Sequence, residues 1–258
     1  MFNPGIEITP TVNHLGFVYG GGCFGPEVEI RTLDSIRKSL RDPDCEGPRE
    51  VYAIAMDVGK EEHKELLKDR MLLFGIVTYA DGKLGDEPIR SQGHIHKVSA
   101  HCGWSTPEVY EIWRGEAIIY MQETARDNPG RCYAVKAKAG DVVIVPPYWA
   151  HSTISASIKE PLTFGAWCDR DYGFEYDDVR AHGGLAFFPV YDENMKIQWQ
   201  KNQNYHGCDL IEKAPSDYSY LGLNKNKPIY SQFEENHDLF LFVSNPQLKE
   251  NKWINFIP

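Results

Sequence analysis

Short runs rich in apolar residues dominate the chain from Glu50 to Val190. Gly, Pro, Asn and Asp residues separate the runs, and short apolar runs between turn residues are typical of β-strands. The pattern predicts strands over residues 50–56, 72–80, 107–113, 117–122, 133–137, 141–145, 151–154, 162–167 and 185–190. Many short strands without long helices between them favour a sandwich or a closed barrel over a βαβ sheet.

The N-terminal part adds shorter elements to this series. Residues 27–30 alternate directly after Pro26, which predicts a turn followed by a short strand. Leu33, Ile36 and Leu40 recur at helical spacing, so residues 31–41 are expected to form a short amphipathic surface helix whose basic residues face solvent.

The C-terminal part has a different character. Beyond about Trp199, asparagines and tyrosines replace most of the apolar runs, and only residues 239–243 predict a strand. We therefore expect an all-β fold with a few short peripheral helices. Residues 1–200 would form a barrel with an N-terminal arm, and residues 201–258 an extension that packs on the barrel or at a dimer interface.

Charge and cysteine content narrow the class of protein. The net charge of −10 over 258 residues argues against a nucleic acid or an anionic membrane as the main partner. The six cysteines contain no C-x-x-C pair, which is typical of a reducing compartment. No signal-peptide pattern and no run of 18 apolar residues is found. A cytoplasmic location is therefore expected.

Three imidazoles and a carboxylate lie on the predicted strands. His94 and His96 are two residues apart, so both leave a strand on the same face. Glu108 begins the next strand, and His151 follows the Pro146-Pro147 turn. If the strands meet in one barrel, this donor set suits one Fe, Mn, Ni, Co or Zn ion and leaves coordination positions open. His101 is an alternative ligand, in a loop that we expect to be flexible.

The spacing of these residues resembles the two signature motifs of the cupin superfamily, whose fold is a double-stranded β-helix (a jelly-roll barrel). Gly93 precedes the H-x-H pair, Gly115 follows Glu108, and His151 follows Pro146 by five residues. Two features depart from the motifs. The loop between His96 and Glu108 is longer than usual, and Ser155 stands where the second motif usually ends in Asn.

Longer phrases resemble one family of cupins. G-H-I-H at 93–96, E-V-Y at 108–110, V-P-P-Y-W-A-H at 145–151 and D-Y-G at 171–173 are similar to the cupin-type glucose-6-phosphate isomerases of archaea and some bacteria. The resemblance covers roughly residues 27–200. It implies a homodimeric enzyme of glycolysis and gluconeogenesis that interconverts glucose 6-phosphate and fructose 6-phosphate. Arg170 departs from this family, which tends to have a His there, and segment 167–169 lacks an expected Tyr.

The resemblance also implies roles for individual residues. The metal ligands would be His94, His96, Glu108 and His151, with iron as the preferred metal. Tyr110, Tyr148 and Tyr172 would lie near the sugar phosphate, although ordinary barrel packing explains Tyr110 and Tyr148 equally well.

The chemistry of the reaction adds further expectations. Hydrogen moves between C1 and C2 either by proton transfer or by a hydride shift, and the sequence does not choose between the two routes. In the proton-transfer route, the developing enediolate needs stabilisation, which a divalent cation supplies. Glu108 would act as ligand, as base, or as both, with Tyr148 as a second catalytic candidate. Lys97 and Arg170 are candidates for the phosphate. The alternatives are a metal-dependent cupin dioxygenase that uses the same four ligands and a non-catalytic cupin that binds a sugar phosphate.

Overall fold

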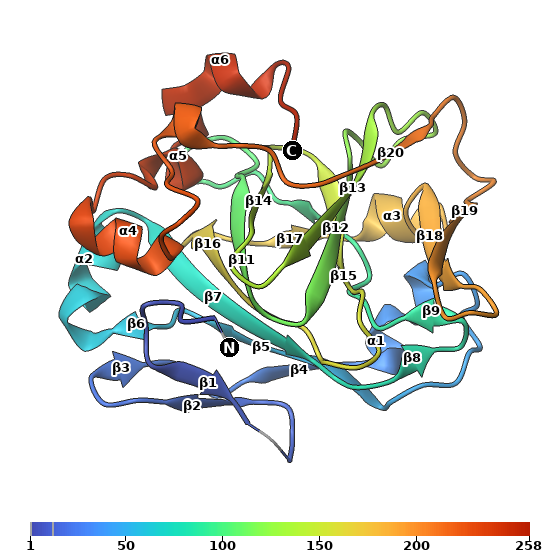
Figure 1. Cartoon of the computed structure of the whole chain (residues 1–258). Helices are drawn as coiled ribbons and strands as arrows, with labels where there is room; N and C mark the ends of the chain where they lie inside the picture. The colour runs from blue at the N-terminus through green and yellow to red at the C-terminus, as the bar shows by residue number, and fades with distance from the viewer. Residues whose placement is uncertain (1, 12) are drawn as a thin grey trace.

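Two β-sheets face each other and form the body of the molecule (Figure 1). The computed structural model describes residues 2–11 and 13–258, and Met1 and Val12 lie outside the described residues. The larger sheet is antiparallel throughout. Its strand order is β14 (Val142–Val145), β11 (Glu108–Arg114), β16 (Thr163–Asp169), β7 (Leu72–Tyr79), β5 (Glu50–Met56) and β4 (Glu29–Thr32).

The second sheet has four strands and closes the barrel. Its order is β15 (Ala150–Ser155), β12 (Glu116–Gln122), β13 (Cys132–Lys138) and β20 (Leu210–Lys213). Only β20 runs parallel to its neighbour in this sheet. Side chains from both sheets fill one core, which includes Tyr110, Ile112, Ile119, Met121, Tyr133 and Val135. The predicted all-β barrel is therefore confirmed.

Strand β11 shows how the alternation divides the side chains between two cores. Tyr110 and Ile112 point into the barrel, whereas Val109 and Trp113 join a separate apolar cluster on the outer face of the larger sheet. Both faces of this strand are buried. Its inward side chains pack in the barrel interior, and its outward side chains pack against the segments that cover the larger sheet.

The C-terminal extension covers that outer face (Figure 1). Its short helices are η3 (Ser219–Leu221), α4 (Ile229–Glu235), α5 (Leu241–Ser244), η4 (Pro246–Lys249) and α6 (Glu250–Trp253). Tyr230 of α4 stacks on Trp167 of β16 with ring centroids 5.6 Å apart, and Phe240 lies 5.4 Å from the same indole. The extension thus belongs to the hydrophobic structure of the protein. The predicted boundary between residues 200 and 201 falls inside strand β19 (Ile197–Lys201).

Most predicted elements agree with the structure. Each of the nine predicted central strands overlaps an observed one, the last being β18 (Phe187–Tyr191). The predicted helix over 31–41 is shorter, as α1 (Leu33–Ile36) followed by η1 (Arg37–Ser39). The strand predicted over 239–243 is wrong, because this segment enters helix α5. Its apolar run fits a buried helix as well as a strand, and no periodicity separates the two.

The remaining elements lie around the barrel. Residues 61–69, read from the sequence only as a charged stretch, form η2 (Glu61–His63) and α2 (Lys64–Asp69). Helix α3 (Asp177–Ala181) follows the larger sheet, and no helix in the described part of the chain is long and apolar enough to cross a membrane. Short pairs complete the fold: β1 (Ile8–Pro10) with β2 (Phe17–Tyr19), β3 (Cys23–Phe24) with β6 (Gly59–Lys60), β8 (Lys83–Leu84) with β9 (Glu87–Pro88), and β10 (Ile95–His96) with β17 (Phe174–Glu175).

Candidate metal centre

Three separate segments bring the predicted metal ligands together. His94 and His151 exchange backbone hydrogen bonds of 3.0 and 2.9 Å, which places β15 beside the segment that enters β10. Glu108 stands at the start of β11, on the same face as Tyr110. One ligand atom from each of His94, His96, Glu108 and His151 lies within 4.8 Å of the others. His101 is exposed and lies outside this group.

The glycine before the first histidine is required by the local backbone. Gly93 has a φ of 88°, and a Cβ at this position would lie 2.9 Å from a methyl carbon of Leu185. Both the left-handed conformation and the close approach favour glycine. The G-H-I-H phrase therefore has a structural reason at its first position.

Backbone carbonyl groups orient two of the imidazole rings. His96 Nδ1 lies 2.9 Å from the Thr106 carbonyl oxygen, and His151 Nδ1 lies 3.1 Å from that of Trp149. Since a carbonyl can only accept, both Nδ1 atoms carry the proton, and each Nε2 presents a lone pair to the centre of the group. This is the arrangement that metal-binding histidines use.

Unpartnered nitrogen atoms support the same assignment. His94 Nε2 and His96 Nε2 are buried and have no hydrogen-bond partner. An unsatisfied buried polar atom costs free energy, and a cation between the rings would satisfy both atoms at once. The residues present therefore fit a divalent metal ion.

Glu108 is held by neighbours on both carboxylate oxygens. Oε2 lies 3.3 Å from His96 Nε2 and 3.3 Å from His151 Nε2, and it accepts a 2.7 Å hydrogen bond from the Tyr110 hydroxyl. The Cys168 thiol donates to Oε1 across 3.5 Å. Oε2 thus faces the imidazoles, while Oε1 has only a weak donor.

Burial and neighbouring groups set the protonation states. Burial acts to raise the pKa of Glu108, but the adjacent imidazoles of His151 and His96 hold it well below its usual value. Burial, reinforced by the neighbouring imidazoles of His151 and His96, lowers the pKa of His94 well below its usual value. An ionised carboxylate beside a neutral imidazole is what cation binding needs.

The predicted tyrosines lie in different environments. Tyr110 is buried and bonded to Glu108. Tyr148 is 46% exposed, has a φ of 71°, and donates its backbone N–H to Ser105 Oγ. Tyr172 is 44% exposed, and its ring lies 5.7 Å from that of Phe174, which in turn packs 4.6 Å from His94.

The two predicted phosphate cations differ in their availability. Arg170 makes two hydrogen bonds to the Asp57 carboxylate, of 2.9 and 2.7 Å. This guanidinium already has an ionic partner. Lys97 is exposed, and the stem of its side chain lies against Gly173.

Four residues near the centre had not been identified from the sequence. Cys168 shares the inward face of β16 with Ala166, which strand alternation extended by one residue would have shown. Phe174 and Tyr176 follow the D-Y-G phrase, and the ring of Tyr176 lies 6.1 Å from His94. Arg31, predicted to face solvent, is the direct cross-strand partner of Tyr52. Neither its position nor that of Tyr176 had a signal in the local sequence.

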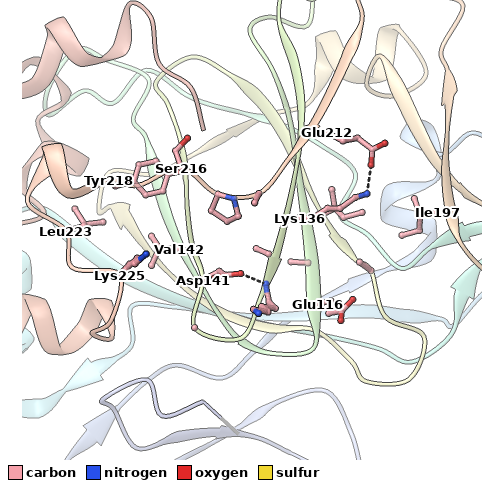
Figure 2. Close-up of a pocket in the computed structure, with 18 of the residues that line it drawn as sticks. Glu116, Lys136, Asp141, Val142, Ile197, Glu212, Ser216, Tyr218, Leu223 and Lys225 are labelled. Atoms are coloured by element: carbon pink, nitrogen blue, oxygen red, sulfur yellow. Dashed lines mark hydrogen bonds and ion pairs between the residues drawn. The ribbon is translucent and has the colours of Figure 1, made fainter.

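A large groove lies elsewhere, between β13, β19 and the segment before α4 (Figure 2). Its volume is about 1090 Å³. Several of its charged groups already have partners: Lys136 contacts Glu212 at 2.6 Å, and Asp141 accepts a bond from the backbone N–H of Lys138 (Figure 2). The described residues that line it include no histidine or cysteine, so the groove has no donor set comparable to that of the metal centre.

Comparisons with known proteins point to one family. The model of the glucose-6-phosphate isomerase (GPI) family matches residues 41–207. The chain is 30% identical to a glucose-6-phosphate isomerase of Thermococcus litoralis over 60% of its own length and 71% of the relative. It is 30% identical to a putative glucose-6-phosphate isomerase 1 of Rhizobium meliloti over 55% of its length, spanning 62% of that relative.

Solved structures resemble the chain more distantly. An oxalate decarboxylase of Bacillus subtilis matches 50% of the chain and 29% of its own length, with 15% identity and a TM-score of 0.35.

Proposed function

The chain belongs to the glucose-6-phosphate isomerase family, and on that basis we propose that it is a metal-dependent isomerase that interconverts glucose 6-phosphate and fructose 6-phosphate. The observation that carries the proposal is the group of His94, His96, Glu108 and His151, whose ligand atoms lie within 4.8 Å of one another. This group lies inside the part of the chain that the family model matches.

The donor set supports one divalent transition metal ion per chain. Three imidazoles and one carboxylate suit iron, which we prefer, and also Mn, Ni, Co or Zn. Such an ion would act as a Lewis acid on the sugar oxygens on which negative charge develops.

The protein's own residues would carry the proton. In the proton-transfer route, Glu108 takes the proton from C2 of the aldose and delivers it to C1 of the enediolate, while the hydroxyl proton moves from O2 to O1 to give the ketose. Oε1 is the oxygen better placed for this step, because Oε2 faces His96 and His151 and accepts the Tyr110 hydroxyl. A direct hydride shift from C2 to C1 would bypass Glu108. Uptake of deuterium from heavy water into the product at C1 separates the two routes.

Arg31 is a better candidate for the phosphate than Arg170. Arg31 is the cross-strand partner of Tyr52. Burial raises the pKa of both Tyr52 and Tyr176, and the positive charge of Arg31 opposes the rise in each case. Tyr176 in turn lies next to His94. The carboxylate that pairs with Arg31 belongs to Glu29, which is 62% exposed, so a substrate phosphate can replace it. Lys97 and Tyr172 remain candidates for the same group, and Tyr148 for contacts to the sugar.

We expect Arg31→Gln to raise KM for fructose 6-phosphate roughly tenfold or more, since a charge-assisted hydrogen bond contributes about 1.5–3 kcal/mol. Metal content should stay the same. Lys38→Gln, which removes a basic residue from η1, is the control and should leave KM unchanged. An unaltered KM in Arg31→Gln would mean that Arg31 does not bind the phosphate and serves only as the ionic partner of Glu29.

The deciding experiment combines metal analysis with an assay for fructose 6-phosphate conversion. Purified protein should contain metal and interconvert the two sugar phosphates. Chelation should abolish turnover, and readdition of one metal should restore it. Turnover that survives in metal-free protein would refute the mechanism. Oxygen consumption with no isomerisation would indicate a dioxygenase, and sugar-phosphate binding without hydrogen transfer would indicate a non-catalytic binding protein. A homodimer and a cytoplasmic location stay predictions, which light scattering and cell fractionation can check.

A further inference from the structure

A second cluster of potential metal ligands lies at the contact between the barrel and the C-terminal extension. Glu62 and His63 belong to η2, and Glu234 belongs to α4. One ligand atom of each lies within 4.8 Å of the others. His237, just after α4, has its ring 5.9 Å from that of His63. None of these residues takes part in the centre around Glu108.

His63 is largely buried, and its ring is held by packing and by a contact at Nδ1. It is only 8% exposed and packs against Phe233, with ring centroids 5.6 Å apart. Its Nδ1 lies 3.2 Å from the Tyr230 hydroxyl oxygen, which also accepts a 2.8 Å bond from the Lys60 N–H. If Nδ1 donates to that oxygen, Nε2 carries the lone pair. Glu62 Oε1 is 3.9 Å from Nε2, which is beyond hydrogen-bond distance.

The geometry needs little adjustment to close around an ion. Two ligands about 2.1 Å from one tetrahedral zinc ion lie roughly 3.4 Å apart, and the ligand atoms here lie within 4.8 Å of one another, so each separation has to shrink by at most ~1.4 Å. Glu62 has an exposed, adjustable side chain. Glu234 pairs with the ammonium of Lys60 through Oε1, which leaves its second oxygen for the ion.

We propose that Glu62, His63 and Glu234 form a second divalent-metal site, of zinc type, that ties helix α4 of the extension to the barrel. One imidazole, two carboxylates and an open position for water or the His237 ring complete a tetrahedral set. The site is independent of the proposed isomerase chemistry.

The test measures zinc bound per chain after dialysis against buffered micromolar free zinc. Wild-type protein should hold two ions, and Glu62→Gln/Glu234→Gln should hold one. The matched control is Glu65→Gln/Glu235→Gln. It removes two nearby carboxylates that also pair with lysines, and it should still hold two. Equal zinc content in wild type and Glu62→Gln/Glu234→Gln would overturn the proposal.

A second background separates this site from the centre around Glu108. His94→Ala/His96→Ala should hold one zinc, and addition of Glu62→Gln/Glu234→Gln should remove it. If His94→Ala/His96→Ala still holds two ions, the ligand assignment around Glu108 is wrong, and the second site is not contradicted. Zinc should also slow hydrogen exchange of the amides of α4 in this background. Unchanged exchange, with zinc bound, would overturn the proposed link between α4 and the barrel.

Discussion

At the scale of single residues, the proposed metal centre depends on ring orientation as much as on the identity of its ligands. His96 and His151 are each turned by a backbone carbonyl that accepts from Nδ1. Those carbonyls belong to Thr106 and Trp149, which are not ligands. Such partners fix the tautomer and direction of the coordinating nitrogen.

We expect His151→Ala to lower bound metal and turnover together. Loss of a direct ligand should reduce turnover roughly 100-fold or more, since loss of an outer partner alone costs about 10–100-fold. Metal analysis and the isomerase assay on the same preparation measure both. His101→Ala, which alters an exposed histidine in a nearby loop, should keep full metal content. Normal turnover in His151→Ala would show that this imidazole is not a ligand.

We expect Cys168 to position the Glu108 carboxylate. Its thiol donates to Oε1, the oxygen that we assign to proton transfer. Cys168→Ala should lower kcat/KM about 2–10-fold, the usual value of a single hydrogen bond, with unchanged metal content. Cys168→Ser should restore most of the loss, because the hydroxyl also donates. Equal rates in the two variants would mean that the thiol only fills space.

At the scale of elements, strand β11 serves the barrel interior with one face and the extension with the other. Its inner face carries Glu108, and its outer face carries Glu111. Glu111 is buried and accepts hydrogen bonds from the N–H of Ile229 at 2.8 Å and from the Trp113 indole at 3.1 Å. It therefore joins the start of α4 to the sheet.

Burial raises the pKa of Glu111 to about 8, although both hydrogen bonds oppose the rise. Below about pH 4.5 this carboxyl is protonated in the folded and unfolded states. As pH rises toward 8, the unfolded chain ionises first, so the free energy of unfolding falls by about 1.4 kcal/mol per unit and by roughly 5 kcal/mol in all. The stabilisation is thus present at low pH and lost as pH rises.

Glu111→Gln should remove this dependence, because the amide does not titrate. Urea unfolding at pH 5 and pH 8 measures the difference between wild type and variant. Glu50→Gln, at the exposed start of β5, should keep the wild-type slope. If Glu111→Gln keeps it as well, the Glu111 carboxyl is already ionised at pH 5 in the folded protein and its pKa is not raised.

An element was predicted correctly where its own sequence showed a clear pattern, and it was missed where the pattern was masked or absent. Strands that are short apolar runs set between turn-rich segments, such as β5 and β12, were predicted within one residue at each end. Helix α2 was missed because its charged residues mask one buried position, Leu67. The apolar residues 239–243 gave no period, and their conformation depends on packing against the outer face of the larger sheet.

At the scale of the whole molecule, the extension explains why the larger sheet is apolar on both faces. Phe74, Ile76 and Trp167 point outward and would be exposed without the segments around α4 and α5. An antiparallel sheet with one free face shows polar residues there. The near-continuous burial of β7 and β16 therefore requires a cover, and residues 218–256 supply much of it.

The sequence by itself determined the strands of the barrel and the residue types of the candidate metal centre, because apolar runs between turn residues and the spacing of ligand residues are local properties. It also carried the family resemblance, which the comparisons confirm. Only the tertiary structure decided that Arg170 pairs with Asp57, that Arg31 and Cys168 face the barrel interior, and that α4 brings Glu234 to His63. Each of these contacts joins residues that are distant along the chain, and their approach follows from the packing of the whole chain rather than from any local pattern.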